Sequence, residues 1–196
     1  MHTLEVAALL SNTKAIAPFI TQAIGIDLSA KMISAYNTLS QENLLSEKMS
    51  ATQGDLLSPS SSTTDLFQDS KFFNFDIIIM SMALHHVSDT QLMIKKLHER
   101  LSEGGVLVIV DWLTMGLGGT RDRHGHQGGH GQEKKIPGSH TVAHFGFSVD
   151  EMKKLYEKAG MVDIGFMEGI EKSKVPPEMG GEQQVFIAKA RKAVRN

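Results

Sequence analysis

The chain has 196 residues, of which 41% are hydrophobic and 21% charged, as is ordinary for a soluble folded domain. Its formal charge of −2 argues against a nucleic-acid partner, and the absence of cysteine excludes disulfides and thiolate chemistry. The apolar runs at 77–80 and 106–110 are far shorter than the roughly 20 residues of a membrane span, and the first residues lack signal-peptide features. We therefore expect one cytoplasmic domain over residues 1–196, without a membrane span.

Strand and helix signals alternate in the first half of the chain. Three short apolar segments are predicted to be strands: 4–8, 23–26 and 49–53. Ser29 is placed to cap a helix whose apolar positions are Met32, Ile33, Tyr36 and Leu39. An earlier helix could begin at Asn12 or Thr13, with the apolar positions Ile16, Phe19, Ile20 and Ala23. The SPSSSTT run over 58–64 predicts a loop.

The clearest strand signal lies at 75–81, where Ile77 to Met80 form an apolar run without alternation. Such a run is typical of a parallel strand that is buried on both faces of the sheet. A helix is predicted from Asp89 to Ser102. Gly104-Gly105 should end it with a left-handed cap.

The last third of the chain continues the alternation. Val106 to Val110 predicts a buried strand, and Ser148 with Glu151 forms a capping box for a helix over 149–159. Two closing strands are predicted at 161–167 and 184–190. The alternating units predict an α/β fold with a doubly wound, mostly parallel sheet.

Three polar strand ends would meet at the carboxyl edge of that sheet, where ligands of α/β folds bind. Asp27 follows the second strand and could accept hydrogen bonds from the ribose of a nucleoside cofactor, or it could only help to cap the next helix. Asp55 with Leu56 could contact an adenine ring, although an ordinary Gly-Asp turn explains the same residues. The third end is the stretch that contains His85 and His86.

In this order, the segments resemble the class I S-adenosylmethionine-dependent methyltransferases, and most closely the small-molecule group with the ubiquinone and menaquinone methyltransferases. The similar segments are IGIDLSAKMISAYN, ATQGDLL, FDIIIMSMALHHVSD, LHERLSEGGVLVIVDW, FSVDEMKKLYEKAGMVDIGF and EQQVFIAKARK. The resemblance covers nearly the whole chain. It implies a Rossmann-like sheet with an antiparallel last strand.

The resemblance also implies a cofactor, S-adenosylmethionine, and a small organic methyl acceptor. The residues that it implies for cofactor binding are Glu5, Asp27, Leu28, Met32, Asp55, Leu56, Ser81, Met82 and Ala83. His85 and His86 are catalytic candidates, one facing the cleft and the other packing. Methyl transfer needs a general base only for a weakly acidic nucleophile, so these imidazoles could instead simply line the pocket. Asp111 is a second candidate to orient the substrate.

The chain departs from this family after the first strand. There the family has alternating glycines, whereas LEVAALLS places Ala7, Ala8 and Leu9 at these positions. The N-terminal helices of the family are also missing, so the domain is expected to be incomplete at its N-terminus. The chain is thus either a truncated or mis-spliced form of an active methyltransferase or a degenerate relative that binds the cofactor weakly or not at all.

A glycine- and histidine-rich insertion is predicted over 113–147, on the substrate side. Its histidines are His124, His126, His130, His140 and His144. The His-x-His spacing could bind zinc, nickel or copper, but a glycine-rich loop offers little fixed geometry, so no metal site is assigned. Phe145 and Phe147 are expected in the core or in the pocket wall.

Overall fold

The computed structural model describes residues 1–6, 17–58, 67–114, 143–175 and 181–195. None of the helices in these ranges is long and apolar enough to cross a membrane.

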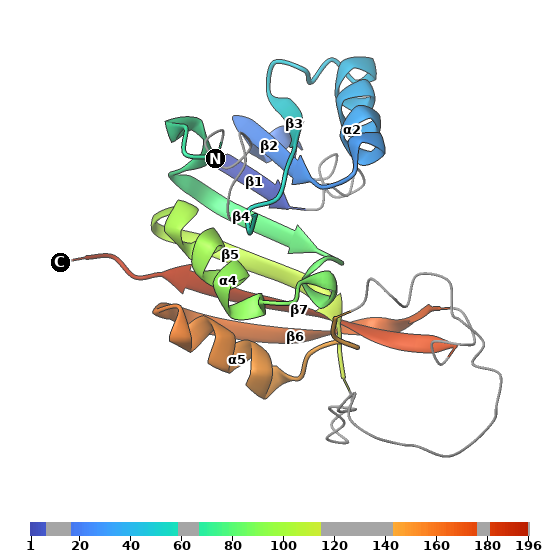
Figure 1. Ribbon diagram of the computed structural model, residues 1–196, viewed down its shortest axis with the longest axis vertical. Helices are drawn as coiled ribbons and strands as arrows, with labels where there is room; N and C mark the ends of the chain where they lie inside the picture. Colours follow the sequence, from blue (N-terminus) through green and yellow to red (C-terminus); the bar gives the residue numbers. More distant parts are fainter. Residues whose placement is uncertain (7–16, 59–66, 115–142, 176–180, 196) are drawn as a thin grey trace.

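The centre of the fold is a seven-stranded sheet with the order β3-β2-β1-β4-β5-β7-β6 (Figure 1). The strands are β1 (His2–Val6), β2 (Gln22–Asp27), β3 (Met49–Gln53), β4 (Phe75–Ser81), β5 (Leu101–Trp112), β6 (Met161–Lys174) and β7 (Glu182–Lys192). The first five strands are parallel to one another, and β7 runs antiparallel to both β5 and β6. The predicted sheet, including its antiparallel last strand, is therefore confirmed.

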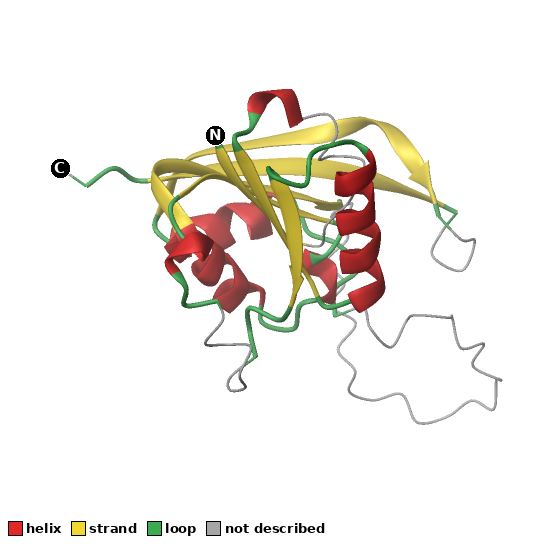
Figure 2. Ribbon diagram, turned by 90° about the horizontal axis from the view of Figure 1, so that it is seen from above, coloured by secondary structure: helices red, strands yellow, loops and turns green. Residues whose placement is uncertain are grey.

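Helices cover both faces of this sheet (Figures 1 and 2). They are α2 (Ala30–Glu42), α4 (Thr90–Arg100) and α5 (Val149–Lys158). Successive residues of a strand point to opposite faces. Ala23 of β2 belongs to the cluster around Tyr36 of α2, whereas the next residue, Ile24, belongs to the cluster with Ile94 of α4. The helices α2 and α4 thus lie on opposite faces, as expected of a doubly wound fold.

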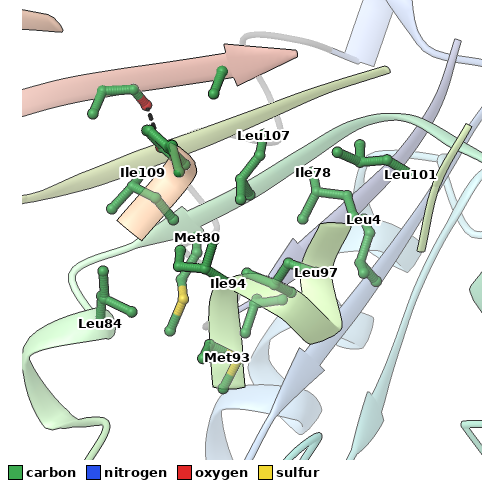
Figure 3. Close-up of a cluster of buried hydrophobic side chains, with 14 of the residues drawn as sticks. Leu4, Ile78, Met80, Leu84, Met93, Ile94, Leu97, Leu101, Leu107 and Ile109 are labelled. Carbon is green, nitrogen blue, oxygen red and sulfur yellow. Dashed lines mark hydrogen bonds between the residues drawn. The ribbon is translucent and has the colours of Figure 1, made fainter. Parts of the chain in front are cut away.

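The larger core cluster lies between α4 and the centre of the sheet. Figure 3 shows Ile94 and Leu97 of α4 near Leu4 of β1 and Ile78 of β4. All four side chains are completely buried. Because burying one such side chain stabilises the fold by about 1.5–3 kcal/mol, this contact fixes α4 against the strands whose ends form the carboxyl edge.

The predicted end of α4 is wrong. The helix ends at Arg100 rather than Ser102, and Leu101 is already extended, with φ −71° and ψ 145°. Leu101 begins β5, where it is buried and pairs with Phe75 of β4. Because Leu101 takes this place in the sheet, the helix cannot continue to Ser102. Gly104 does adopt a positive φ of 74°, but it lies in the irregular part of β5, where the register shifts against β4.

The earliest predicted helix is also partly wrong. In the described residues before β2, the helical structure is limited to a short 3-10 turn, η1 (Ala17–Phe19), and Phe19 is 74% exposed. Ala23 lies in β2, where it pairs with Met49 of β3. Asn12, Thr13 and Ile16 lie outside the described residues.

Several local predictions are confirmed. The side chain of Ser29 accepts a hydrogen bond from the Met32 N–H, and Ser148 with Glu151 forms the predicted capping box. The closing strand β6 is longer than predicted and continues to Lys174. Most of the predicted loop at 58–64 and of the insertion at 113–147 lies outside the described residues, so the place of the insertion over the substrate stays a prediction.

Candidate functional site

A cavity of about 780 Å³ opens at the carboxyl edge of the parallel strands. Its walls are the ends of β1, β2 and β4, the turn after β3, and the segment that leads into α4. The chain continues from β1 toward β3 on one side and from β4 toward β5 on the other, so the cavity lies where the strand order reverses. Ligands of α/β folds bind at this kind of switch point, and the volume falls within the usual range of about 300–1,000 Å³.

Two carboxylates from neighbouring strand ends lie in the wall. Asp27 ends β2, and its Oδ1 accepts a hydrogen bond from the Ser29 N–H at 2.7 Å. Asp55 follows β3, and its Oδ1 accepts from the Leu57 N–H at 2.8 Å. The Gly54 N–H donates to the backbone oxygen of Asp27 at 3.0 Å and thereby joins the two turns. Since a carboxylate has about four acceptor positions, each of these acids keeps capacity for a ligand.

Gly54 has a packing role at this turn. A Cβ atom added to Gly54 would lie 2.3 Å from Cε2 of Phe67, far inside van der Waals contact. Phe67 is 1% exposed and packs edge-on against Phe72, with 5.0 Å between the ring centroids. The glycine therefore allows the backbone beside Asp55 to lie directly on a buried aromatic ring.

The opposite wall of the cavity is apolar. Met80 and Met82 reach it from the end of β4, and Leu92 and Met93 reach it from α4. Met82 has a φ of 52° and donates its N–H to the backbone oxygen of Val110 at 2.8 Å. A left-handed conformation costs a non-glycine residue about 1–2 kcal/mol, so the neighbouring β5 contact holds this residue in a strained position in the cavity wall.

The charges of the wall have one sign. Asp27, Asp55 and Asp89 line the cavity, and no lysine or arginine is among its described lining residues. Phosphate groups would meet repulsion here without a compensating cation. The wall is better suited to a ligand that carries a positive charge.

The two histidines take different positions after β4, in the short turn η3 (Leu84–His86). His85 is 7% exposed, and its Nδ1 lies 2.7 Å from Oδ1 of the fully buried Asp111. His86 is exposed and lines the cavity, and its ring centroid lies 4.1 Å from that of His85. This matches the expectation that one imidazole faces the cleft while the other packs.

The residues proposed for cofactor binding divide into two groups. Six of them line the cavity: Asp27, Leu28, Asp55, Leu56, Met82 and Ala83. Three do not line it: Glu5, Met32 and Ser81. Glu5 is buried within β1, opposite Gly25 of β2, and Ser81 is buried at the end of β4. The positions Ala7 to Leu9 lie outside the described residues.

Sequence reasoning missed the part of the wall that leads into α4. These residues are Val87, Ser88, Asp89, Leu92 and Met93. Asp89 caps α4, because its Oδ1 accepts from the Leu92 N–H at 2.9 Å. That cap was recognisable in the sequence directly behind the two histidines, and it could have indicated that the first turn of the helix borders the site.

A later segment, residues 143–147, is hydrogen-bonded to the turn that carries the two histidines. The N–H groups of Ala143 and His144 both donate to the backbone oxygen of His85 at 2.9 Å. Phe147 is buried as expected, but Phe145 is 72% exposed, so its predicted place in the core or wall is wrong. Glycine at 146 has a φ of 122° and turns the chain between these two aromatic residues.

The histidine-rich loop, to which the sequence analysis assigns no metal site, lies largely outside the described residues. His124, His126, His130 and His140 fall in the undescribed stretch. Within the described ranges, no group of three or more histidine, aspartate or glutamate side chains could hold a metal ion.

Comparisons with known proteins agree with this architecture. Residues 6–107, more than half of the chain, match the family model described as "Methyltransferase domain". An uncharacterized methyltransferase of Schizosaccharomyces pombe is 30% identical over 100 residues, which are 50% of this chain but only 34% of that protein. The chain thus spans about a third of the length of this curated relative.

Solved structures show the same fold at low sequence identity. A methyltransferase candidate from Bacillus halodurans has a TM-score of 0.66 at 14% identity, with 98% of this chain and 93% of that chain covered. Phosphoethanolamine N-methyltransferase 2 of Haemonchus contortus, solved with S-adenosyl-L-methionine, has a TM-score of 0.62 at 13% identity, with 99% of this chain and 49% of that chain covered.

Proposed function

The chain belongs to the class I S-adenosylmethionine-dependent methyltransferases, and on this premise we propose that it transfers the methyl group of S-adenosylmethionine to a small organic acceptor. The observation that carries the proposal is the cavity at the carboxyl edge, with Asp27 and Asp55 in its wall on two neighbouring strand ends. Its volume and its lining are those of a site for a small molecule. We also expect the protein to act in the cytoplasm, in keeping with its lack of cysteine.

The residues of the wall fit this cofactor chemically. Asp27 would accept hydrogen bonds from the ribose hydroxyls, and Asp55 with Leu56 would contact the adenine. Met82 and Ala83 would flank the cofactor beside the apolar wall. The excess of carboxylates in the wall favours a cationic sulfonium over a phosphate-bearing dinucleotide.

When bound, S-adenosylmethionine supplies an already activated methyl group. Much of the remaining barrier can then be overcome by holding the acceptor close and in line. The task of this chain is therefore to bind both molecules and to exclude water between them.

A second candidate is a relative that binds the cofactor weakly or not at all. Ala7, Ala8 and Leu9 favour it, because side chains at positions that are glycine in the family would hinder close backbone approach. Calorimetry with S-adenosylmethionine and S-adenosylhomocysteine separates the two candidates. Saturable binding supports the enzyme, whereas no heat at millimolar ligand supports the impaired relative.

The Asp27→Ala variant tests the site itself. Hydrogen bonds to a charged group contribute about 1.5–3 kcal/mol, so we expect the Kd for S-adenosylmethionine to rise roughly 10- to 150-fold. Asp150→Ala is a matched control, because Asp150 is exposed at the start of α5 and does not line the cavity. Wild-type affinity in Asp27→Ala would show that the ribose contact is assigned to the wrong residue.

A further inference from the structure

The end of β5 carries a buried carboxylate with an unusual set of partners. Asp111 is 0% exposed, and three N–H groups lie against its two oxygens. Oδ1 accepts from the Trp112 N–H at 2.7 Å and lies 2.7 Å from Nδ1 of His85, and Oδ2 accepts from the His85 N–H at 3.1 Å. Two of the three donors thus belong to His85, so Asp111 fixes both the backbone and the ring of that residue.

The contact between Asp111 and His85 selects one tautomer of the ring. An ionised carboxylate can only accept, so Nδ1 of His85 carries the hydrogen. Among the described residues, Asp111 is the hydrogen-bond partner of this ring. His85 is therefore held in one orientation and one tautomer, although it does not line the cavity.

His86 connects this buried pair to the cavity. The ring centroids of His85 and His86 lie 4.1 Å apart, and the ring planes are tilted by 42°. The buried ring of His85 therefore packs against the ring of His86. The His86 N–H also donates to the backbone oxygen of Ala83 at 3.1 Å, which fixes the turn. The order from the core outward is thus Asp111, His85, His86 and the cavity.

His86 shares the wall of the cavity with several carboxylates. Asp27, Asp55 and Asp89 lie in the wall that His86 shares, and Asp111 lies behind it. His144, another titratable residue, comes from the segment bonded to the backbone of His85. Carboxylates in the wall of a cavity stabilise a cation that forms there during a reaction.

We infer that Asp111, acting through His85, positions His86 to take a proton from the methyl acceptor. The inference rests on the proposed function, and it narrows the acceptor to a molecule whose reacting oxygen or nitrogen carries a hydrogen. The lone pair of that atom forms the bond to the methyl carbon. The carbon–sulfur bond breaks, its electron pair stays on sulfur to give the thioether, and the acceptor proton passes to a ring nitrogen of His86 and then to water. Asp111 and His85 are positioning residues, and His86 is the catalytic residue.

The first test needs no cofactor. Long-range ¹H–¹⁵N NMR of the free protein should show His85 as a single tautomer with the hydrogen on Nδ1. In Asp111→Asn this selection should be lost, whereas His98→Gln, which alters a histidine outside the cavity, should leave the His85 signals unchanged. A wild-type His85 with its hydrogen on Nε2, or with a mixture of tautomers, would overturn the inference. If Asp111→Asn does not fold, His85→Gln is used instead, because the two backbone N–H donors to Asp111 remain in this variant. The signals of His86 in His85→Gln are then compared with those in the wild-type protein.

The second test measures transfer to a panel of phenols, alcohols and primary amines beside tertiary amines. With proton-bearing acceptors, kcat should fall about 100-fold or more in His86→Gln and about 10-fold in Asp111→Asn, with little change in KM. An unchanged kcat in His86→Gln, or wild-type transfer to tertiary amines alone, contradicts the inference. So does a wild-type protein that binds S-adenosylmethionine but methylates none of the proton-bearing acceptors. A wild-type protein that does not bind the cofactor contradicts the proposed function instead, while the NMR result still decides the arrangement of Asp111 and His85.

Discussion

Replacing Gly54 by alanine should damage the turn that carries Asp55. The new Cβ would lie 2.3 Å from Cε2 and 2.4 Å from Cζ of Phe67, whereas ordinary contacts begin at 3.4 Å. The ring would have to move by about 1 Å, but it is 1% exposed and is held edge-on against Phe72. Overpacking of this kind costs about 1–3 kcal/mol.

For a domain of this size, 1 kcal/mol corresponds to about 2–4 °C in Tm, so we expect a loss of about 2–12 °C in Gly54→Ala. Thermal melting by circular dichroism and urea titration both measure it. Gly165→Ala is the matched control, because its Cβ would meet only the flexible side chain of Lys189, at 3.0 Å. This control should stay within about 1 kcal/mol of wild type.

A double variant identifies the cause of the loss. In Gly54→Ala with Phe67→Leu, the smaller side chain removes the clash, so the combined cost should be less than the sum of the single costs by about 0.5–3 kcal/mol. Additive costs, or wild-type stability of Gly54→Ala alone, would refute the idea that Phe67 requires a glycine at this turn.

Two further predictions concern stability away from the cavity. Ser148→Ala should lower the free energy of unfolding by about 0.5–2 kcal/mol in urea titration, because it removes the cap of α5, whereas Ser148→Gly should cost only a few tenths; equal costs would contradict a capping role. Burial raises the pKa of Tyr156, whose hydroxyl donates to the backbone oxygen of Ala188 at 3.0 Å. The folded-state pKa of Tyr156 lies above the unfolded value of about 10, so above this pH the phenol ionises in the unfolded chain first. The free energy of unfolding is therefore unaffected by this group below pH 10 and falls above it, by up to about 1.4 kcal/mol per pH unit. Urea titrations between pH 9 and 11 should show a smaller fall in Tyr156→Phe, and an identical fall in both proteins would refute this assignment.

The elements that were predicted well have local causes. The caps at Ser29 and Ser148 and the unbroken apolar run before Ser81 act over a few residues, so they are visible in the sequence. The end of α4 was missed because it depends on Leu101 finding a buried place beside Phe75, which is a contact between distant segments. No helix-end signal in the sequence reports such a contact.

The site shows the same division between local and distant causes. Asp27 and Asp55 could be assigned to the cavity edge because each directly follows a strand. The bond between His85 and Asp111 joins residues 26 positions apart, and the packing of Phe67 on Gly54 depends on how two turns meet. These pairings follow from the order of the strands in the sheet, which the sequence does not display directly.

The position of β7 has a consequence for how the sheet is completed. Although β7 follows β6 in the chain, it lies between β5 and β6 and pairs with both. A nascent chain that has made β6 but not β7 therefore leaves the long edge of β5 open, and unpaired edges of this kind invite association between chains. Arg191 and Lys192 complete the closure, since they donate to the backbone oxygens of Gly104 and Leu101 at 2.8 Å and 2.7 Å. The insertion of β7 between β5 and β6 therefore closes an edge that is open to association with other chains until β7 has been made.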